Sequence, residues 1–184
     1  MSKAAAFGLY PHYTYEDYRS WEGRWELIRG VPYAMTPLPH PKHQRLSGRI
    51  AYLLEKAFEE VGCPECVALL PVDWKISEDT VVQPDNLVYC GDLPEEDFIT
   101  EPPVVIFEVL SPSTARKDRI LKFALYEEAG VKYYVLVDPD RNEAEVFRLK
   151  EGRYLREGIF SEGSYTFDPG PCRLNFDFGR LFRF

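Results

Sequence analysis

Three polar side chains of this sequence stand among apolar neighbours, at positions where a folded chain normally buries its surface. Asp85 follows Pro84 in the segment VVQPDNLVY, Glu108 lies within VVIFEVL, and Lys122 borders the apolar stripe of a predicted helix. A buried carboxylate is costly unless it is paired or binds a cation. These three residues are therefore the first candidates for a catalytic or metal-binding role.

The two carboxylates can converge if their strands are neighbours in one sheet. Alternation places Asp85 on the same strand face as Gln83, and Glu108 on the same face as Leu110. Two carboxylates and a backbone carbonyl, here that of Val109, suit a hard divalent cation such as Mg²⁺. A lysine beside that ion can orient or deprotonate a water molecule, or stabilise developing negative charge. The combination predicts hydrolysis of a phosphodiester.

The segment that must position Glu108 and Lys122 reads as strand, helix and strand. Apolar runs at 104–110 and 133–137 predict two buried strands, and the spacing of Ile120, Leu121 and Leu125 predicts a helix over 113–129. Short joints between these elements imply parallel strands with a right-handed crossover.

The remaining elements are predicted from apolar periodicity and from turn residues. They are a short helix over 14–22, two strands within 25–35, a loop at 36–41, a long helix over 42–61, a hairpin of strands 67–76 and 81–89, an acidic loop at 91–102, strands at 144–149, 154–159 and 164–167, and an aromatic segment at 173–184 that packs back on the domain. This order predicts an α/β or α+β fold with a mixed central sheet.

We expect one domain spanning all 184 residues. Its expected parts are a loose arm at 1–12, an N-terminal helix and hairpin at 13–41, a core at 42–149, and C-terminal strands with an aromatic tail at 150–184. No apolar run approaches the roughly 20 residues of a membrane span, and residues 1–9 lack the apolar core of a signal peptide. A soluble, cytoplasmic protein that does not bind a membrane is therefore expected.

The net charge of −8, from 30 acidic and 22 basic residues, argues against nonspecific coating of nucleic acid. It leaves room for a local basic groove near the starts of two helices. The candidate contacts for such a groove are Lys42, Arg45, Arg49, Arg116, Lys117 and Arg119.

The sequence contains four cysteines, of which Cys63 and Cys66 form a CxxC pair. A single CxxC is a weak zinc signal, although Cys90 and Cys172 could complete a set of four ligands. Reduced thiols at a helix end and a strand start are the simpler expectation.

An ordered set of residues resembles a known family. The set is Pro84-Asp85, Glu108 with the Val-Leu-Ser-Pro-Ser-Thr that follows it, Asp118, Lys122, Tyr126, Gly130-Val131, Tyr134 and Asp138-Pro139. It is similar to the Uma-type family of putative restriction endonucleases within the PD-(D/E)xK nuclease superfamily. The resemblance extends roughly from Trp25 to Leu149.

The resemblance implies a restriction-endonuclease-like mixed sheet flanked by helices, with an N-terminal helix–hairpin extension. It also implies a Mg²⁺-dependent DNA endonuclease, with Mn²⁺ as a substitute ion, in which Asp85, Glu108 and Lys122 are catalytic. Because nucleases that cut both strands often act as dimers, a homodimer is expected.

One position departs from the superfamily pattern, which places lysine two residues after Glu108, where this chain has Leu110. The family implies that Lys122 takes over this role from the following helix, with Gln83 as a rival. Glu26 and His43 match positions that the family tends to fill, and Glu26 is a candidate for a further metal ligand or hydrogen-bond acceptor.

Two other classes of function remain open at this stage. The acidic balance and the residues Glu95, Glu96 and Asp97 favour a non-catalytic binding module that retains the nuclease fold. A zinc-stabilised module using Cys63 and Cys66 is a further alternative.

Overall fold

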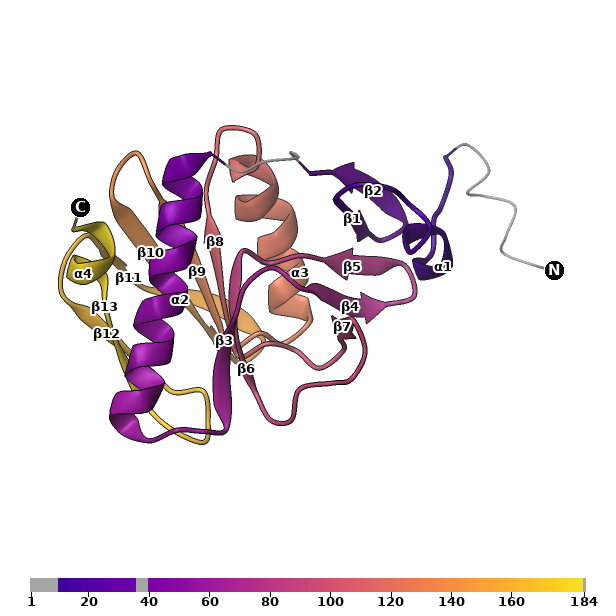
Figure 1. Cartoon of the computed structure of the whole chain (residues 1–184). Helices are drawn as coiled ribbons and strands as arrows, with labels where there is room; N and C mark the ends of the chain where they lie inside the picture. The colour runs from indigo at the N-terminus through magenta and orange to yellow at the C-terminus, as the bar shows by residue number, and fades with distance from the viewer. Residues whose placement is uncertain (1–9, 36–39, 184) are drawn as a thin grey trace.

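The central sheet is mixed, as the sequence predicts, and it carries the strand with Glu108 at its middle (Figure 1). The computed structural model describes residues 10–35 and 40–183, so most of the expected arm at 1–12, most of the loop at 36–41 and Phe184 lie outside it. The strand order is β11-β10-β9-β8-β6-β3. The strands are β3 (Cys66–Leu69), β6 (Asn86–Cys90), β8 (Val105–Val109), β9 (Tyr133–Asp138), β10 (Glu143–Lys150) and β11 (Arg153–Phe160).

Strands β8 and β9 are parallel, whereas the other pairs in this sheet are antiparallel. The parallel register pairs Glu108 with Leu136. The predicted strand–helix–strand unit is therefore confirmed, and its crossover helix lies over one face of the sheet (Figure 1).

A second sheet extends from the central one on the side of the N-terminus, in the order β2-β1-β5-β4-β7 (Figure 1). Its strands are β1 (Trp25–Ile28), β2 (Val31–Ala34), β4 (Asp73–Ser77), β5 (Thr80–Val82) and β7 (Phe98–Ile99), and the short helix α1 (Tyr15–Tyr18) precedes them. The predicted helix over 14–22 is thus only one turn long. Strand β7 lies within the segment that was expected to be an acidic loop.

The hairpin predicted at 67–76 and 81–89 is present, but each of its long strands is divided between the two sheets. Its inner half, β3 with β6, belongs to the central sheet, and its outer half, β4 with β5, belongs to the second sheet. The breaks contain Pro71 and Pro84, and proline has no N–H to donate to a strand ladder. Consequently Gln83 and Asp85 lie at the crossing between the sheets rather than inside a regular strand.

The two faces of the central sheet are covered by different elements. The long helix α2 (Pro41–Val61) begins near the predicted residue and ends at Gly62, whose φ of 66° is the left-handed conformation that suits glycine. It packs on the face that carries Val105, Phe107 and Val109, whereas Ile106 and Leu110 face the crossover helix. The strand alternation assumed for Glu108 is therefore confirmed.

The helix predicted over 113–129 contains a π-helical turn. Residues 115–116 are α-helical, η2 (Lys117–Lys122) is π-helical, and α3 (Phe123–Glu128) completes the helix. π-helical turns are rare and are found frequently at functional sites. This turn contains both Asp118 and Lys122, which are buried although they are charged.

All four cysteines are disulfide-bonded, so the expectation of reduced thiols is wrong for this structure. The pairs are Cys63–Cys172, separated by 109 residues, and Cys66–Cys90, separated by 24. Cys66 and Cys90 face each other across the β3–β6 ladder, and the C-terminal segment returns Cys172 to the end of α2. These proximities come from tertiary structure, which sequence spacing does not reveal.

The C-terminal segment packs back on α2, as expected, through β12 (Ser164–Phe167), β13 (Leu174–Asp177) and α4 (Phe178–Phe182). Phe178 is fully buried and its ring stacks on Phe160, with ring centroids 5.1 Å apart. Among the described helices, none is long and apolar enough to cross a membrane.

Replacing Phe178 with alanine should lower the free energy of unfolding by about 3–5 kcal/mol, because it leaves a cavity in the core beneath α2. Urea denaturation of the variant measures this change. The control is Leu155→Ala, which removes a half-exposed side chain from β11 and should change stability by less than about 0.5 kcal/mol. Equal effects of the two substitutions would show that the aromatic segment is not part of the core.

Candidate active site

Asp85 and Glu108 meet because their strands are neighbours. Asp85 directly precedes β6, which pairs with β8, and its backbone N–H donates to Glu108 Oε2 at 3.4 Å. The N–H of Val109 donates to Asp85 Oδ2 at 2.8 Å. The structure thus brings together the two carboxylates that the sequence singled out.

Lys122 reaches the same point from the π-helical turn. Its Nζ lies 2.8 Å from Glu108 Oε1, 2.7 Å from Glu26 Oε1 and 3.9 Å from Asp118 Oδ1. Only 2% of its side chain is exposed, so Lys122 is not a surface lysine paired with Asp118 one turn away. The ammonium group is the shared partner of three carboxylates from three elements.

Glu26 is supplied by β1 of the second sheet and is completely buried. Its Oε2 lies 2.5 Å from Lys117 Nζ, and its Oε1 accepts the backbone N–H of Gln83 at 2.9 Å. Lys117, a candidate for contact with nucleic acid, is therefore an internal partner of Glu26. The second sheet is joined to the site through this carboxylate.

His43 enters from the first turn of α2, with its Nε2 3.0 Å from Asp85 Oδ2. Its other ring nitrogen, Nδ1, is buried and has no hydrogen-bond partner among the described residues. Both sites proposed by resemblance, Glu26 and His43, thus lie beside the carboxylate pair.

The side chain of Gln83 turns toward the second sheet. Its amide nitrogen donates to Asp73 Oδ1 at 2.7 Å and to the Tyr18 hydroxyl at 3.2 Å, and its Oε1 accepts from Arg24 at 3.2 Å. Its amide is therefore occupied away from the Asp85 carboxylate.

Two tyrosines that had no assigned role complete the cluster. Tyr126 donates its hydroxyl to Glu108 Oε1 at 2.8 Å, and Tyr134 donates to the backbone carbonyl of Asp118 at 2.9 Å. Tyr126 lies four residues after Lys122, and this helical spacing was the available signal that both side chains lie on one face.

The carboxylates have opposite electrostatic environments. Burial raises the pKa of Glu108 well above its usual range; the Lys122 ammonium offsets this only in part, and Asp85, Asp118 and Glu26 raise it further. For Glu26 burial also acts to raise the pKa, but the ammonium groups of Lys122 and Lys117 outweigh it, so that the pKa is lowered. Glu26 is thus held as a carboxylate, whereas ionised Glu108 lacks sufficient compensating positive charge.

Lys122 is held in its charged form. Burial alone would lower its pKa, but Glu108, Glu26 and Asp118 raise that pKa well above the usual value. At Asp85 burial acts to raise the pKa, and the hydrogen bond and charge of His43 lower it overall. Lys122 therefore acts as a fixed positive charge near neutral pH.

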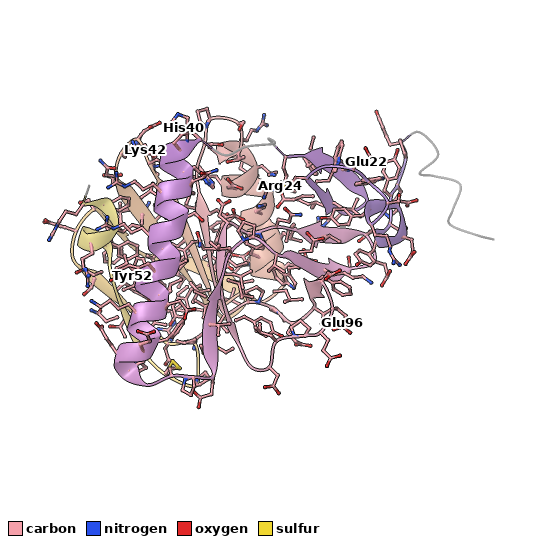
Figure 2. All side chains as sticks on the ribbon, in the orientation of Figure 1. Glu22, Arg24, His40, Lys42, Tyr52 and Glu96 are labelled. Carbon is pink, nitrogen blue, oxygen red and sulfur yellow. A yellow bond between two sulfur atoms is a disulfide. The ribbon has the colours of Figure 1, made fainter. Side chains whose placement is uncertain are left out.

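A pocket of about 510 Å³ opens over these residues, and its lining includes Asp85, Glu108 and Lys122. Its lining also includes Ser111 and Thr114 of the loop after β8. Figure 2 labels two other lining residues, His40 at the start of α2 and Arg24 beside the second sheet.

The donor set fits a hard divalent cation. Asp85 and Glu108 offer carboxylate oxygens, the ligands that Mg²⁺ prefers, and the positive charge of an ion would compensate ionised Glu108. Within 10–35 and 40–183, the only close group of three His, Cys, Asp or Glu ligand atoms is a cysteine cluster. The acidic site therefore supplies two carboxylates, which leaves further ligands to a backbone carbonyl such as that of Val109, or to water.

The other predicted basic contacts lie at the surface or pair with acids. Lys42 Nζ is 3.8 Å from Asp140 Oδ1, and Arg119 lies 2.6 Å from Glu145 Oε1. Arg45 and Arg116 are exposed, and Arg49 is half-buried.

Residues 15–169 match the family model described as "Uma2: Putative restriction endonuclease". The chain belongs to this Uma2 family. Its fold is also similar to the crystal structure of a putative nuclease belonging to DUF820 from Anabaena variabilis, with a TM-score of 0.72, 18% sequence identity, and coverage of 92% of this chain and 97% of that chain. At this identity the likeness shows the fold alone. No curated protein matches the chain.

Membership of the Uma2 family confirms the resemblance drawn from the sequence, and the structural likeness confirms the predicted fold class. The roles of individual residues, including Asp85, Glu108 and Lys122, remain predictions.

Neutral isosteres of the two buried glutamates should have opposite effects. Glu26→Gln should lower the free energy of unfolding by about 3 kcal/mol at neutral pH, because it removes a carboxylate that pairs with both the buried Lys122 ammonium and the half-buried Lys117 ammonium. Glu108→Gln should leave stability unchanged or raise it by about 1 kcal/mol, because it removes a poorly compensated buried charge. Urea denaturation of both variants without added metal measures these changes, and each variant controls for the other.

Acidification separates charge from packing. The contribution of Glu26, whose pKa is lowered by folding, is present above the ordinary pKa of about 4.3 and is lost as pH falls through its folded value. The cost of ionising Glu108, whose pKa is raised, is absent below about pH 4.3, grows as the pH rises toward the folded pKa and is complete above it. Both differences from wild type should therefore shrink at about pH 3. Differences that persist unchanged in acid would contradict the electrostatic explanation.

Proposed function

We propose that this chain is a Mg²⁺-dependent endonuclease that hydrolyses phosphodiester bonds in DNA, with Mn²⁺ as a substitute ion. The observation that carries the proposal is the meeting of Asp85 and Glu108 with the buried Lys122 ammonium in one open pocket. Membership of the Uma2 family supports a nuclease. A DNA-cleaving role would place the protein in the cytoplasm, and cutting of both strands would favour a homodimer.

Asp85 and Glu108 would hold the ion, with the Val109 carbonyl as a third ligand. A bound Mg²⁺ would polarise a phosphate oxygen and lower the pKa of its own water. Val109 N–H and His43 orient the Asp85 carboxylate through their hydrogen bonds, and Tyr126 orients Glu108. These contacts keep both carboxylates in place without an ion.

Lys122 would stabilise the negative charge that develops on the phosphate. Since its pKa is raised well above the usual value, it is a poor base at neutral pH, which argues against removal of a proton from water. A fixed charge in a site of low dielectric is an effective way to stabilise a transition state.

DNA would approach across the start of α2 and the loop after β8, where the pocket opens. The exposed side chains of Arg45 and Arg116 would contact phosphates there. Lys42 and Arg119, which pair with Asp140 and Glu145, would contribute further phosphate contacts. Because the chain carries a net charge of −8, we expect such contacts to be local.

A non-catalytic binding module is the second candidate. Its support is the ion pair and hydrogen bond that Lys122 and Tyr126 already make with Glu108, together with the net negative charge. Binding of Mn²⁺ at Asp85 and Glu108 is expected only for the nuclease.

The wild-type chain should nick supercoiled plasmid and single-stranded DNA with Mg²⁺ or Mn²⁺, and it should be inactive in EDTA. Asp85→Asn should lower cleavage at least about 100-fold and weaken Mn²⁺ binding, because one of the two carboxylate ligands loses its charge. The matched control is Asp140→Asn, an exposed carboxylate that should retain both properties. Absence of both cleavage and bound Mn²⁺ in the wild type would instead support the binding module.

Lys122→Met keeps most of the length of the side chain and removes its charge. Cleavage should fall at least about 100-fold while Mn²⁺ binding persists, since an ammonium group is not a metal ligand. The control is Lys56→Met on an outer part of α2, and circular dichroism checks folding of both variants. Lys122→Gln serves as a second variant if methionine disturbs the packing. Full activity of a folded Lys122 variant would remove this residue from the mechanism.

A further inference from the structure

All four cysteines of the chain gather at one end of the molecule, where helix α2 finishes. Cys63 follows the Gly62 cap of α2, Cys66 begins β3, Cys90 ends β6, and Cys172 precedes β13. Figure 2 shows a yellow disulfide bond beside this end of α2. Four separate segments therefore supply sulfur atoms to one place.

A sulfur atom of one disulfide lies close to both sulfur atoms of the other. The Sγ atoms of Cys63, Cys66 and Cys172 all lie within 4.8 Å of one another, although Cys66 is bonded to neither of the other two. Cys90 joins the group through its bond to Cys66. Two independent disulfides have no need to touch, so this arrangement calls for a different explanation.

Reduction of the two disulfides lets the sulfurs take the spacing of a tetrahedral zinc site. Zn–S bonds of about 2.3 Å place the sulfurs about 3.8 Å apart, so the bonded pairs would separate to this distance, whereas Cys66 already lies within 4.8 Å of Cys63 and Cys172. Cys63-Pro64-Glu65-Cys66 has the two-residue spacing of a zinc-binding loop. Four protein ligands would close the coordination sphere, as in structural zinc sites.

The surroundings also suit such an ion. Cys63 and Cys66 are 4% and 2% exposed, which would shield the ion from water, and a pocket over them provides access. Glu55 and Glu59 line that pocket, and their negative charge favours the approach of a cation.

We propose that the reduced chain binds one structural Zn²⁺ ion through Cys63, Cys66, Cys90 and Cys172, and that the two disulfides are the oxidised form of this site. Cytosolic thiols are normally kept reduced, so the chain would carry four thiols here inside a cell. Two equivalents of a dithiol reduce the two disulfides to four thiols and leave as disulfides of the reductant. Zn²⁺ then displaces four protons as the thiols become thiolate ligands.

The ion would fasten the C-terminal segment to the end of α2 and to the edge of the central sheet. Helix α2 carries His43 at its opposite end, so the site would hold in place the helix that borders the pocket. This role is structural and does not depend on whether the chain cleaves DNA.

The test is elemental analysis of the full chain after purification in a phosphine reductant with zinc supplied during expression. We expect one Zn²⁺ per chain, and tetrahedral thiolate bands in the absorption spectrum after exchange for Co²⁺. Cys63→Ser/Cys172→Ser should lose the metal, whereas Asp85→Asn should keep it, which separates this site from the acidic pocket. Removal of Zn²⁺ by a chelator should lower the melting temperature of the reduced wild type.

A second measurement does not require the variants to fold. Stepwise modification of wild-type thiols by an organomercurial should release Zn²⁺ in proportion to the thiols modified. Reduced protein with four reactive thiols and no zinc would overturn the proposal. Zinc that persists in the double serine variant, or disulfides that resist the reductant, would also overturn it.

Discussion

The buried ammonium group of Lys122 is the charge on which the arrangement of this molecule depends. It lies within 4 Å of carboxylates from β1, β8 and its own helix, and only 2% of its side chain is exposed. Removing this ammonium group would leave buried carboxylates uncompensated in a medium of low dielectric. The second sheet, the central sheet and the crossover helix are therefore joined by electrostatics as well as by apolar contact. The π-helical turn contributes by carrying both Asp118 and Lys122 inside.

The carboxylates around Lys122 are not equally compensated by positive charge. Glu26 contacts both Lys117 and Lys122 and stays ionised, whereas Glu108 shares one ammonium with its neighbours and has a raised pKa. A purely structural core would gain stability by replacing such a carboxylate with an apolar residue. A carboxylate that lacks compensation beside an open pocket is instead what a site for a cation requires. The incomplete compensation of ionised Glu108 thus both costs stability and favours the binding of a cation under the proposed function.

Helix α2 connects two chemically different ends of the protein. Its first turn places His43 against Asp85, and its last turn leads into Cys63 of the cysteine cluster. Between them its apolar face covers the sheet that carries Glu108.

The hairpin that is divided at Pro71 and Pro84 positions the other carboxylate, because the break places Asp85 at the junction of the two sheets.

The sequence alone determined the main elements of the central sheet, its two long helical segments and the carboxylate pair. Apolar periodicity located the long helix, the parallel strands around Glu108 and the crossover helix, because burial leaves a repeating pattern along each element. Charged residues within those patterns revealed Asp85, Glu108 and Lys122. Tertiary structure alone decided that Glu26 pairs with both Lys117 and Lys122, that the amide of Gln83 turns away from Asp85, and that the hairpin is divided between two sheets. It also decided that Cys63, Cys66 and Cys172 lie together, with Cys90 bonded to Cys66. Those contacts join segments far apart in the chain, and their partners depend on how sheets and helices pack, which leaves no periodic signal in the residues themselves.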